Sequence, residues 1–238
     1  MQELSPKMTL CPLGAQDCPI CDKARQLQEE CDRLQELVHT DHLTGFFNRR
    51  HLMKALDQEM ERTRRTGLPT SLIMLDLDYF KKINDTYGHH AGDEALRWST
   101  GLWRASLRRI DIPCRYGGEE FAIILPGTRL NTAVRVARRL QDMLQNSPLV
   151  IQGQEVTLTV SLGVAAYKPQ EELTVRAFIK RADHYLLEAK IKGRNQVCYQ
   201  RAEPDKETAE VSVDERSALF GKAAASIPIP KKRTSRKD

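Results

Sequence analysis

The sequence lacks the long apolar run that a membrane-spanning helix needs. No stretch of the 238 residues approaches the ~18 consecutive apolar residues required to cross a bilayer. The opening residues, MQELSPKMTL, have neither the basic start nor the apolar stretch of a signal peptide. We therefore expect a cytoplasmic protein without a transmembrane segment. No internal repeat is present, and a hydrophobic content of 40% is enough for a packed core.

The chain has little net charge outside its C-terminal end. The formal net charge is +5, but the last eight residues, KKRTSRKD, contain five basic residues and one acidic residue and so carry +4. The nearly balanced remainder argues against a nucleic-acid partner. The basic end could contact RNA or anionic lipid, although a plain solubilising tail is the commoner role of such a segment.

A second CxxC pair, which would complete a four-cysteine zinc site, is missing. One pair is present in CPIC, and His39 and His42 are possible additional ligands. Two interpretations stay open: a zinc or redox sensor, or incidental cysteines with one of them in a helical seam. The cysteines are Cys11, Cys18, Cys21, Cys31, Cys114 and Cys198.

Composition divides the chain into four parts. Residues 1–21 contain cysteines and prolines and are expected to be irregular. Residues 22–40 predict a helical stalk, residues 41–200 a globular domain, and residues 201–238 a disordered tail with a basic end, because that tail lacks a core pattern. The first forty residues leave no room for a large sensor domain, so we expect control through oligomer state, this segment, product binding or a partner protein.

The predicted stalk has an apolar stripe at alternating spacings of three and four residues. The stripe is formed by Ala24, Leu27, Cys31, Leu34 and Val38. This is the a/d pattern of a coiled coil, but it covers only about two heptads. A short dimerising coiled coil and a helix that packs on its own domain both fit the pattern.

The globular part alternates helical and strand patterns. Helices are predicted over residues 48–67, 92–109, 130–146 and 174–193, strands over 71–78 and 155–167, and a hairpin over 114–126. The hairpin makes at least part of the sheet antiparallel. The pattern predicts an α+β, or mixed-sheet α/β, domain.

Acidic residues end the first predicted strand, in LDLD. Strand alternation places Asp76 and Asp78 on one face, and a lysine, Lys81, follows closely. Mg²⁺ takes oxygen ligands, often one or two carboxylates together with phosphates, and lysine supplies a point charge for phosphate oxygens. A strand end that meets a polar turn is the plainer interpretation of these acids taken alone.

The hairpin CRYGGEEFAIILP carries a second acidic group at its tip. Gly117 and Gly118 are expected to allow positive φ angles and the close approach of a ligand. Glu119 lies beside them and can supply a further metal-binding carboxylate. An acid-tipped strand beside an acid-tipped hairpin forms a two-strand metal platform for phosphoryl or nucleotidyl transfer.

Five motifs, in order, resemble the GGDEF family of diguanylate cyclases over about residues 41–200. They are DHLTGFFNRR, LDLDYFKKINDTYGHHAGD, RRIDIPCRYGGEEF, SLGVA and EAKIKGRN. The resemblance implies a nucleotidyl-cyclase palm-like domain with a central, mainly antiparallel sheet flanked by helices. It also implies the condensation of two GTP molecules into cyclic di-GMP with release of two pyrophosphates, by two domains that face each other in a homodimer or higher oligomer.

The resemblance also implies residue roles. Catalysis falls to Asp76, Glu119 and Glu120, and the ligands of Mg²⁺ or Mn²⁺ are Asp76, Glu119 and the carbonyl of Leu77. The GTP contacts are Phe80, Lys81, Asn84, Asp93, Gly117, Gly118, Lys190 and Arg194. Among these, Asn84 and Asp93 match the guanine readers. A carboxylate such as Asp93 can accept from both N1–H and N2–H₂ of guanine, whereas adenine presents an acceptor at N1, so GTP is the expected substrate.

An inhibitory product site is implied by the RxxD pattern five residues before the signature. The site comprises Arg108, Asp111, Arg115 and Arg139. Arginine can bind phosphate or the guanine edge in bidentate fashion. On spacing alone, a helix end with a surface ion pair is the favoured interpretation of the pattern.

One departure from the family pattern lies in ADHYLLEAK. Tyr185 replaces a small residue and Leu187 replaces a tyrosine, while Lys190 and Arg194 are retained. We expect the change to be tolerated. Two alternatives to catalysis stay open: a catalytically weak module that senses GTP or cyclic di-GMP, and a scaffold that docks a regulatory protein through the N-terminal helix.

Overall fold

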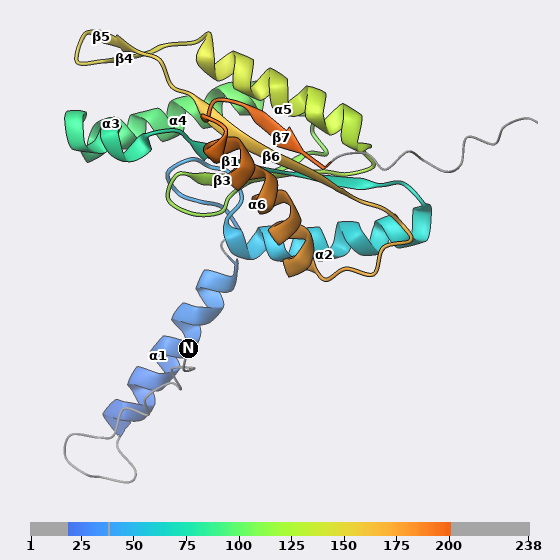
Figure 1. Ribbon diagram of the computed structural model, residues 1–238. Coiled ribbons are helices and arrows are strands. Elements are labelled where there is room, and N and C mark those ends of the chain that lie inside the picture. Colours follow the sequence, from blue (N-terminus) through green and yellow to red (C-terminus); the bar gives the residue numbers. More distant parts are fainter. Residues whose placement is uncertain (1–18, 38, 201–238) are drawn as a thin grey trace, which may run out of the picture. The chain divides into compact units, whose positions relative to one another are not determined.

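The computed structural model describes residues 19–37 and 39–200 (Figure 1). The predictions for residues 1–18 and for the tail 201–238 lie outside the described residues, as do Cys11, Cys18 and Val38. The side chains of Cys21, Cys31 and Leu34 are also outside the description.

Helices and strands are interleaved along the described chain, as the pattern predicts. The helices are α1 (Pro19–Leu37), α2 (Arg49–Thr66), α3 (Phe80–Tyr87), α4 (His89–Ser106), α5 (Leu130–Gln145) and α6 (Val175–Ile191). The strands are β1 (Thr70–Leu77), β2 (Ile112–Arg115), β3 (Glu120–Leu125), β4 (Leu149–Ile151), β5 (Gln154–Val156), β6 (Val160–Tyr167) and β7 (Val197–Tyr199).

The main sheet has five strands in the order β2-β3-β1-β6-β7. Neighbouring strands pair in antiparallel fashion, except that β7 runs parallel to β6. The predicted fold class, an α+β domain with a mainly antiparallel mixed sheet, is therefore confirmed.

Strand β1 lies at the centre of this sheet and is buried along its whole length. Its side chains alternate between two cores: Ile73 and Leu75 belong to one, and Leu72 and Met74 to the other. Burial on both faces explains why the sequence here is a continuous apolar run rather than an alternating one. The same strand brings Asp76 to the edge of the core.

Helices supply the remaining side chains of both cores. In the first core, the sheet packs with α4 and α5, and Trp103 is fully buried against Phe121 with ring centroids 5.2 Å apart. In the second core, the sheet packs with α2 and α6, where Leu56 and Phe178 are fully buried. The sheet is thus held on both faces, which fixes the ends of its strands.

The ends of the predicted helices follow capping chemistry. The Asn48 side chain accepts a hydrogen bond from the His51 backbone N–H at 2.9 Å, and α2 stops at Gly67, whose φ is 76°. Helix α1 begins at Pro19, within the segment expected to be irregular, because proline fits the first turn of a helix. Helix α4 begins at His89, before the expected start at residue 92.

The single strand predicted over residues 155–167 is wrong. Strand β5 ends at Val156 and pairs with β4 in a separate two-stranded sheet, while β6 starts at Val160. Gln152 and Gly153 form the turn between β4 and β5, with φ values of 51° and 80°, the positive angles of a tight hairpin turn. Helix α3 and the short strands β4 and β7 were not anticipated from the sequence.

Helix α1 contains the stalk-stripe positions from Ala24 to Leu34, whereas Val38 lies outside the described residues. Within it, residues 22–30 are exposed, and Leu27 retains 56% of its accessible surface. Arg25 and Asp22 form an ion pair at 3.5 Å on its surface. The dimerising stalk remains a prediction. No helix in the described part of the chain is long and apolar enough to cross a membrane.

Candidate active site

The acidic ends of two neighbouring strands lie side by side. Asp76 in β1 stands opposite Glu120 in β3, and the Leu77 N–H donates a hydrogen bond to the Glu119 carbonyl at 3.3 Å. The strand register therefore brings together Asp76, Leu77, Glu119 and Glu120, which are separated by more than forty positions in the sequence.

Burial and mutual repulsion raise the proton affinity of these acids. Burial raises the pKa of Asp76 above its ordinary value, against the opposing effect of Lys190. The pKa of Glu119 is raised by burial and then by the negative charge of Asp76. Carboxylates in such surroundings gain stability from a bound cation.

Basic side chains approach the same place from α6 and the turn that follows it. The Nζ atom of Lys190 lies 2.7 Å from Oδ2 of Asp76. Arg194 is exposed, and its guanidinium lies 4.9 Å from the centre of the Tyr79 ring. Lys81 is exposed in the first turn of α3, next to the buried Phe80. Two of the three expected phosphate contacts thus come from helices α3 and α6, and the third, Arg194, comes from the turn after α6.

The signature turn differs from the expectation in one respect. Neither Gly117 nor Gly118 has a φ in the left-handed region, so positive φ is not the reason for these glycines. At Gly117, a Cβ atom would lie 2.5 Å from Oε2 of Glu120. The missing side chain therefore makes room for the Glu120 carboxylate to fold over the turn. At Gly118, no atom lies within 4 Å of such a Cβ, which leaves the backbone open to a ligand.

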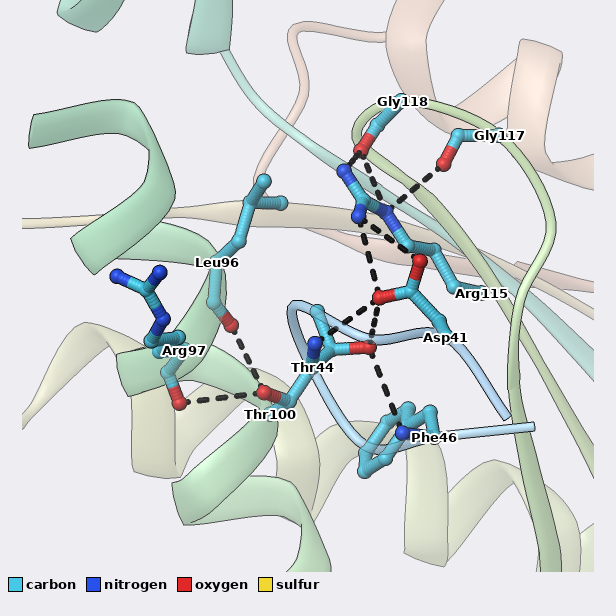
Figure 2. Close-up of polar contacts among 9 residues, drawn as sticks. All are labelled: Asp41, Thr44, Phe46, Leu96, Arg97, Thr100, Arg115, Gly117 and Gly118. Carbon is cyan, nitrogen blue, oxygen red and sulfur yellow. Dashed lines mark hydrogen bonds and ion pairs between the residues drawn. The ribbon is translucent and has the colours of Figure 1, made fainter. Parts of the chain in front are cut away.

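Arg115 fastens the signature turn to the beginning of the domain. Figure 2 shows its guanidinium between Asp41 and the carbonyls of Gly117 and Gly118. Its Nη1 donates to both Asp41 oxygens at 3.1 Å, and its Nη2 donates to the Gly118 carbonyl at 2.8 Å. Its Nε donates to both glycine carbonyls at 3.1 Å. Although burial opposes it, hydrogen bonds from Thr44 and the charge of Arg115 hold the pKa of Asp41 below its ordinary value.

The two expected guanine readers lie at the junction of α3 and α4. Asn84 belongs to α3 and is half-buried, and Asp93 belongs to α4. Gly92 precedes Asp93 in the sequence, and a Cβ atom at Gly92 would lie 1.9 Å from Oδ1 of Asn84. The carboxamide of Asn84 therefore lies directly on the α4 backbone, one residue before Asp93.

The donor set fits a divalent cation that is shared with a nucleotide. Among the described residues, no group of three or more His, Cys, Asp or Glu side chains is arranged to hold a metal ion by itself. Mg²⁺ needs fewer protein ligands than that, because it keeps waters and binds substrate phosphates. Asp76, Glu119 and the Leu77 carbonyl could supply hard oxygen ligands to such a cation, and the raised pKa values of the two acids suit a positive charge.

The four residues of the expected inhibitory site lie in different surroundings. Arg108 donates its backbone N–H to Oδ2 of the buried Asp111 at 2.8 Å, while Oδ1 of Asp111 is buried without a hydrogen-bond partner. Burial raises the pKa of Asp111, and the charges of Arg108 and Arg139 oppose the rise. Arg108 and Asp111 line a cavity of about 270 Å³. Arg115 instead points to Asp41 and the signature turn.

Sequence reasoning gave no role to a cluster that lies directly beside the acidic platform. Asp78 is buried and accepts hydrogen bonds from the Ser161 and Thr159 hydroxyls and from the Asn195 backbone N–H. The second acid of LDLD and the serine of SLGVA were visible as motif residues. Their contact depends on the pairing of β1 with β6, which the sequence does not display.

Two cysteines, Cys114 and Cys198, have side chains that the structure describes, and both lie inside the globular domain. Cys114 and Cys198 are buried and free, and burial raises the pKa of Cys114 to about 12. His39 lies beside His51, with ring centroids 5.3 Å apart. The departure at Leu187 leaves that side chain 55% exposed on α6, so it does not disturb the core.

Comparison with models of protein families shows which family the chain belongs to. The model of the diguanylate cyclase GGDEF domain matches residues 38–196. The chain belongs to the GGDEF family. This GGDEF domain is 43% identical, over 173 residues, to the response regulator PleD of Caulobacter vibrioides, covering 72% of this chain and 38% of that protein. It is 40% identical to the probable diguanylate cyclase DgcC of Escherichia coli, covering 72% of this chain and 46% of that one.

Solved GGDEF structures share the fold. The diguanylate cyclase SiaD of Pseudomonas aeruginosa, solved in complex with its activator SiaC, superposes with a TM-score of 0.65 at 36% identity, covering 76% of this chain and 69% of that one. The coiled coil and GGDEF domain of DgcB from Caulobacter crescentus, in complex with c-di-GMP, gives a TM-score of 0.65 at 28% identity, covering 75% and 94%. This chain spans less than half the length of the two curated relatives named above.

Proposed function

We propose that the protein is a diguanylate cyclase that condenses two GTP molecules into cyclic di-GMP. The observation that carries the proposal is the junction of the β1 and β3 ends, where Asp76 stands opposite Glu120 in the strand register. Lys190, from α6, forms an ion pair with the Asp76 carboxylate at this junction. Acids for a cation and bases for phosphates are both needed at a site of nucleotidyl transfer.

The proposed chemistry is an in-line displacement, performed twice. The 3′-hydroxyl oxygen of one GTP forms a bond to the α-phosphorus of the other, and the bond from that phosphorus to the bridging oxygen breaks to release pyrophosphate. A divalent cation, Mg²⁺ or Mn²⁺, supplies charge neutralisation at the phosphates when it is bound. Glu120 accepts the proton of the hydroxyl, and Lys81, Lys190 and Arg194 hold the triphosphate.

Asn84 and Asp93 are the proposed readers of the guanine base. Asp93 accepts hydrogen bonds from two adjacent guanine donors and meets an acceptor when adenine takes that place. The close contact of Asn84 with Gly92 supports the assignment, because it holds the carboxamide one residue from Asp93. Phe80, Gly117 and Gly118 complete the proposed binding surface, over which the nucleotide lies.

Two domains are needed for one reaction, because each binds one substrate. We propose a homodimer whose domains, over residues 41–200, are brought together through the stalk of residues 22–40. Its exposed stripe residue Leu27 supports this assignment. The relative SiaD is seen with its activator, and the relative DgcB has a coiled coil. A regulatory protein that acts on α1 is therefore part of the proposal.

Product inhibition is proposed at Arg108, Asp111 and Arg139, whereas Arg115 is assigned to the support of the signature turn. The buried, unpartnered Oδ1 of Asp111 supports a ligand at this place, because a guanine N–H donor would satisfy it. Arg139 lines a second cavity, of about 490 Å³, together with Arg135 and Arg138. These arginines supply the positive charge that a dinucleotide requires.

The test is an assay of the purified protein with GTP and MgCl₂, with products identified by mass spectrometry. We expect cyclic di-GMP and two pyrophosphates for each molecule formed. Glu119→Gln removes a proposed cation ligand and should abolish product, while Glu61→Gln, an exposed acid on α2, serves as the matched control. Saturable binding of GTP or cyclic di-GMP with no product from the wild-type protein would favour the sensing module instead.

A further inference from the structure

Asp78 uses both of its carboxylate oxygens to bind the protein itself. Its Oδ1 accepts from the Ser161 hydroxyl at 2.6 Å. Its Oδ2 accepts from the Thr159 hydroxyl at 2.9 Å and from the backbone N–H of Asn195 at 3.0 Å. The side chain is buried, and a buried carboxylate is costly unless such donors surround it.

The third donor belongs to a turn with unusual backbone angles. Gly193, Arg194 and Asn195 follow α6 with φ values of 111°, 63° and 45°. Among the described non-glycine residues, only Tyr79, Gln152, Arg194 and Asn195 have positive φ. Asn195 itself donates the hydrogen bond to Asp78, Arg194 precedes Asn195, and Tyr79 follows Asp78 in the sequence. Non-glycine residues keep such angles only where their surroundings hold them.

Further contacts fix the same turn from its other side. The side chain of Gln141 donates to the Asn195 carbonyl at 2.6 Å, and the Asn195 carboxamide donates to Gln145 at 3.1 Å. The Arg194 N–H donates to the Ala189 carbonyl at 3.0 Å. Asp78 is thus the link between this turn and the end of β1, where the acidic platform lies.

We propose that Asp78 is a positioning residue that acts through Arg194. By holding the Asn195 N–H, its carboxylate fixes the turn so that the Arg194 guanidinium lies over Tyr79, at the side of the platform where the triphosphate binds. The two acids of LDLD therefore have different roles: Asp76 contacts Lys190 and binds the cation, and Asp78 holds the turn that positions Arg194. The inference rests on the proposed function, because it assigns Arg194 to the triphosphate.

A double-mutant cycle tests the inference by equilibrium binding. The probe is 3′-deoxy-GTP with Mg²⁺, which lacks the attacking hydroxyl and so cannot condense. Asp78→Asn keeps the shape of the side chain but removes its charge, and it should weaken probe binding about tenfold. Arg194→Ala should weaken binding by a similar factor. The double variant should bind no more weakly than Arg194→Ala alone, because the two residues act through one contact.

The matched control is Ser161→Ala. It removes one donor from Oδ1 but leaves the Asn195 contact on Oδ2, so thermal stability should fall while probe affinity stays within about twofold. If Asp78→Asn does not fold, amide hydrogen exchange of the wild-type protein gives the answer. The Asn195 N–H should be protected without nucleotide, and rapid exchange at this amide would overturn the inference.

The outcomes separate this inference from the proposed function. Additive losses in the cycle, or no loss in Asp78→Asn, would overturn the positioning role even if the wild-type protein makes cyclic di-GMP. A loss of Mn²⁺ affinity in nucleotide-free Asp78→Asn as large as in Asp76→Asn would identify Asp78 as a cation ligand instead. Non-additive losses in a protein that binds the probe but forms no product would overturn only the proposed function. A wild-type protein that does not bind the probe would overturn both.

Discussion

Lys190 neutralises Asp76 in the nucleotide-free protein, with Nζ 2.7 Å from Oδ2. Burial raises the pKa of Asp76, and this lysine is the main group that opposes the rise. The proposed cation ligand and the proposed phosphate contact are therefore partners before any ligand arrives. When a nucleotide and its cation bind, Asp76 can exchange the ammonium for the cation, and Lys190 can move to the triphosphate.

This pairing predicts opposite effects of one substitution on two ligands. Lys190→Met should strengthen Mn²⁺ binding in the absence of nucleotide, by about tenfold, because the cation no longer competes with an ammonium for Asp76. The same substitution should weaken GTP binding. Calorimetric titrations with each ligand measure both effects, and Lys192→Met, two positions further on, is the control. Weaker Mn²⁺ binding in Lys190→Met would contradict the exchange.

The close contact between Gly92 and Asn84 predicts that a substitution at Gly92 reduces the preference for GTP over ATP, whereas the same substitution at another glycine of α4 does not. Gly92→Ala places a methyl group where the Asn84 carboxamide lies, so the carboxamide must move. GTP affinity should fall about tenfold, and preference for GTP over ATP should narrow, because a displaced guanine reader leaves polar groups unpaired. Competition binding with the two nucleotides measures this.

The control for this prediction is Gly101→Ala in the same helix. No atom lies within 4 Å of a Cβ at Gly101, so this substitution changes helix propensity alone and should stabilise the protein slightly. Equal nucleotide preference in Gly92→Ala and the wild-type protein would show that the base is read elsewhere.

A substitution at Arg115 tests whether this residue supports the signature turn or contacts the product. Arg115→Lys keeps the positive charge but cannot reach Asp41 and the two glycine carbonyls together, since a lysine has a single nitrogen. The turnover rate measured before cyclic di-GMP accumulates should fall about tenfold, while the affinity for cyclic di-GMP should not change. Arg62→Lys, on the exposed side of α2, is the control. The opposite result, lower product affinity with normal turnover, would place Arg115 in the inhibitory site.

Asp111 predicts a pH dependence of product binding. Burial raises its pKa above the ordinary value of 3.8, and a guanine donor prefers the ionised carboxylate. Binding therefore releases a proton near the raised pKa, and cyclic di-GMP affinity should increase as pH rises through that value and level off above it. Calorimetry in buffers of different ionisation enthalpy measures the released proton. Asp111→Asn should bind weakly and with no such pH dependence, and an unchanged dependence in that variant would assign the proton to another group.

The stalk predicts activity that depends on protein concentration. Two heptads bury little apolar area, so association through α1 should be weak. Leu27→Glu with Leu34→Glu should lower specific activity most at high dilution, while GTP binding by the monomer survives. Light scattering and rate measurements across a dilution series test this. Unchanged mass and activity would mean that the dimer forms through another surface.

Long patterned segments were predictable, and short ones were not. The apolar run of β1 and the capped helix α2 have strong signals, since eight buried residues or a cap followed by a periodic helix stand out in the sequence. Strands β4, β5 and β7 have three residues each, too few to show a period. Their pairing is decided by a Gln152–Gly153 turn and by the neighbouring strand β6.

The sequence by itself determined the family, the central strand and the acids at its end, because these are carried by contiguous motifs. Only the tertiary structure decided which partners each acid contacts. Asp76 and Asp78 are equivalent in the motif, yet one meets Lys190 and the other meets Ser161 and Asn195. Those partners lie 83 to 117 positions away from Asp78. Strand register and the course of the chain after α6 set such contacts, and neither is written in a local pattern.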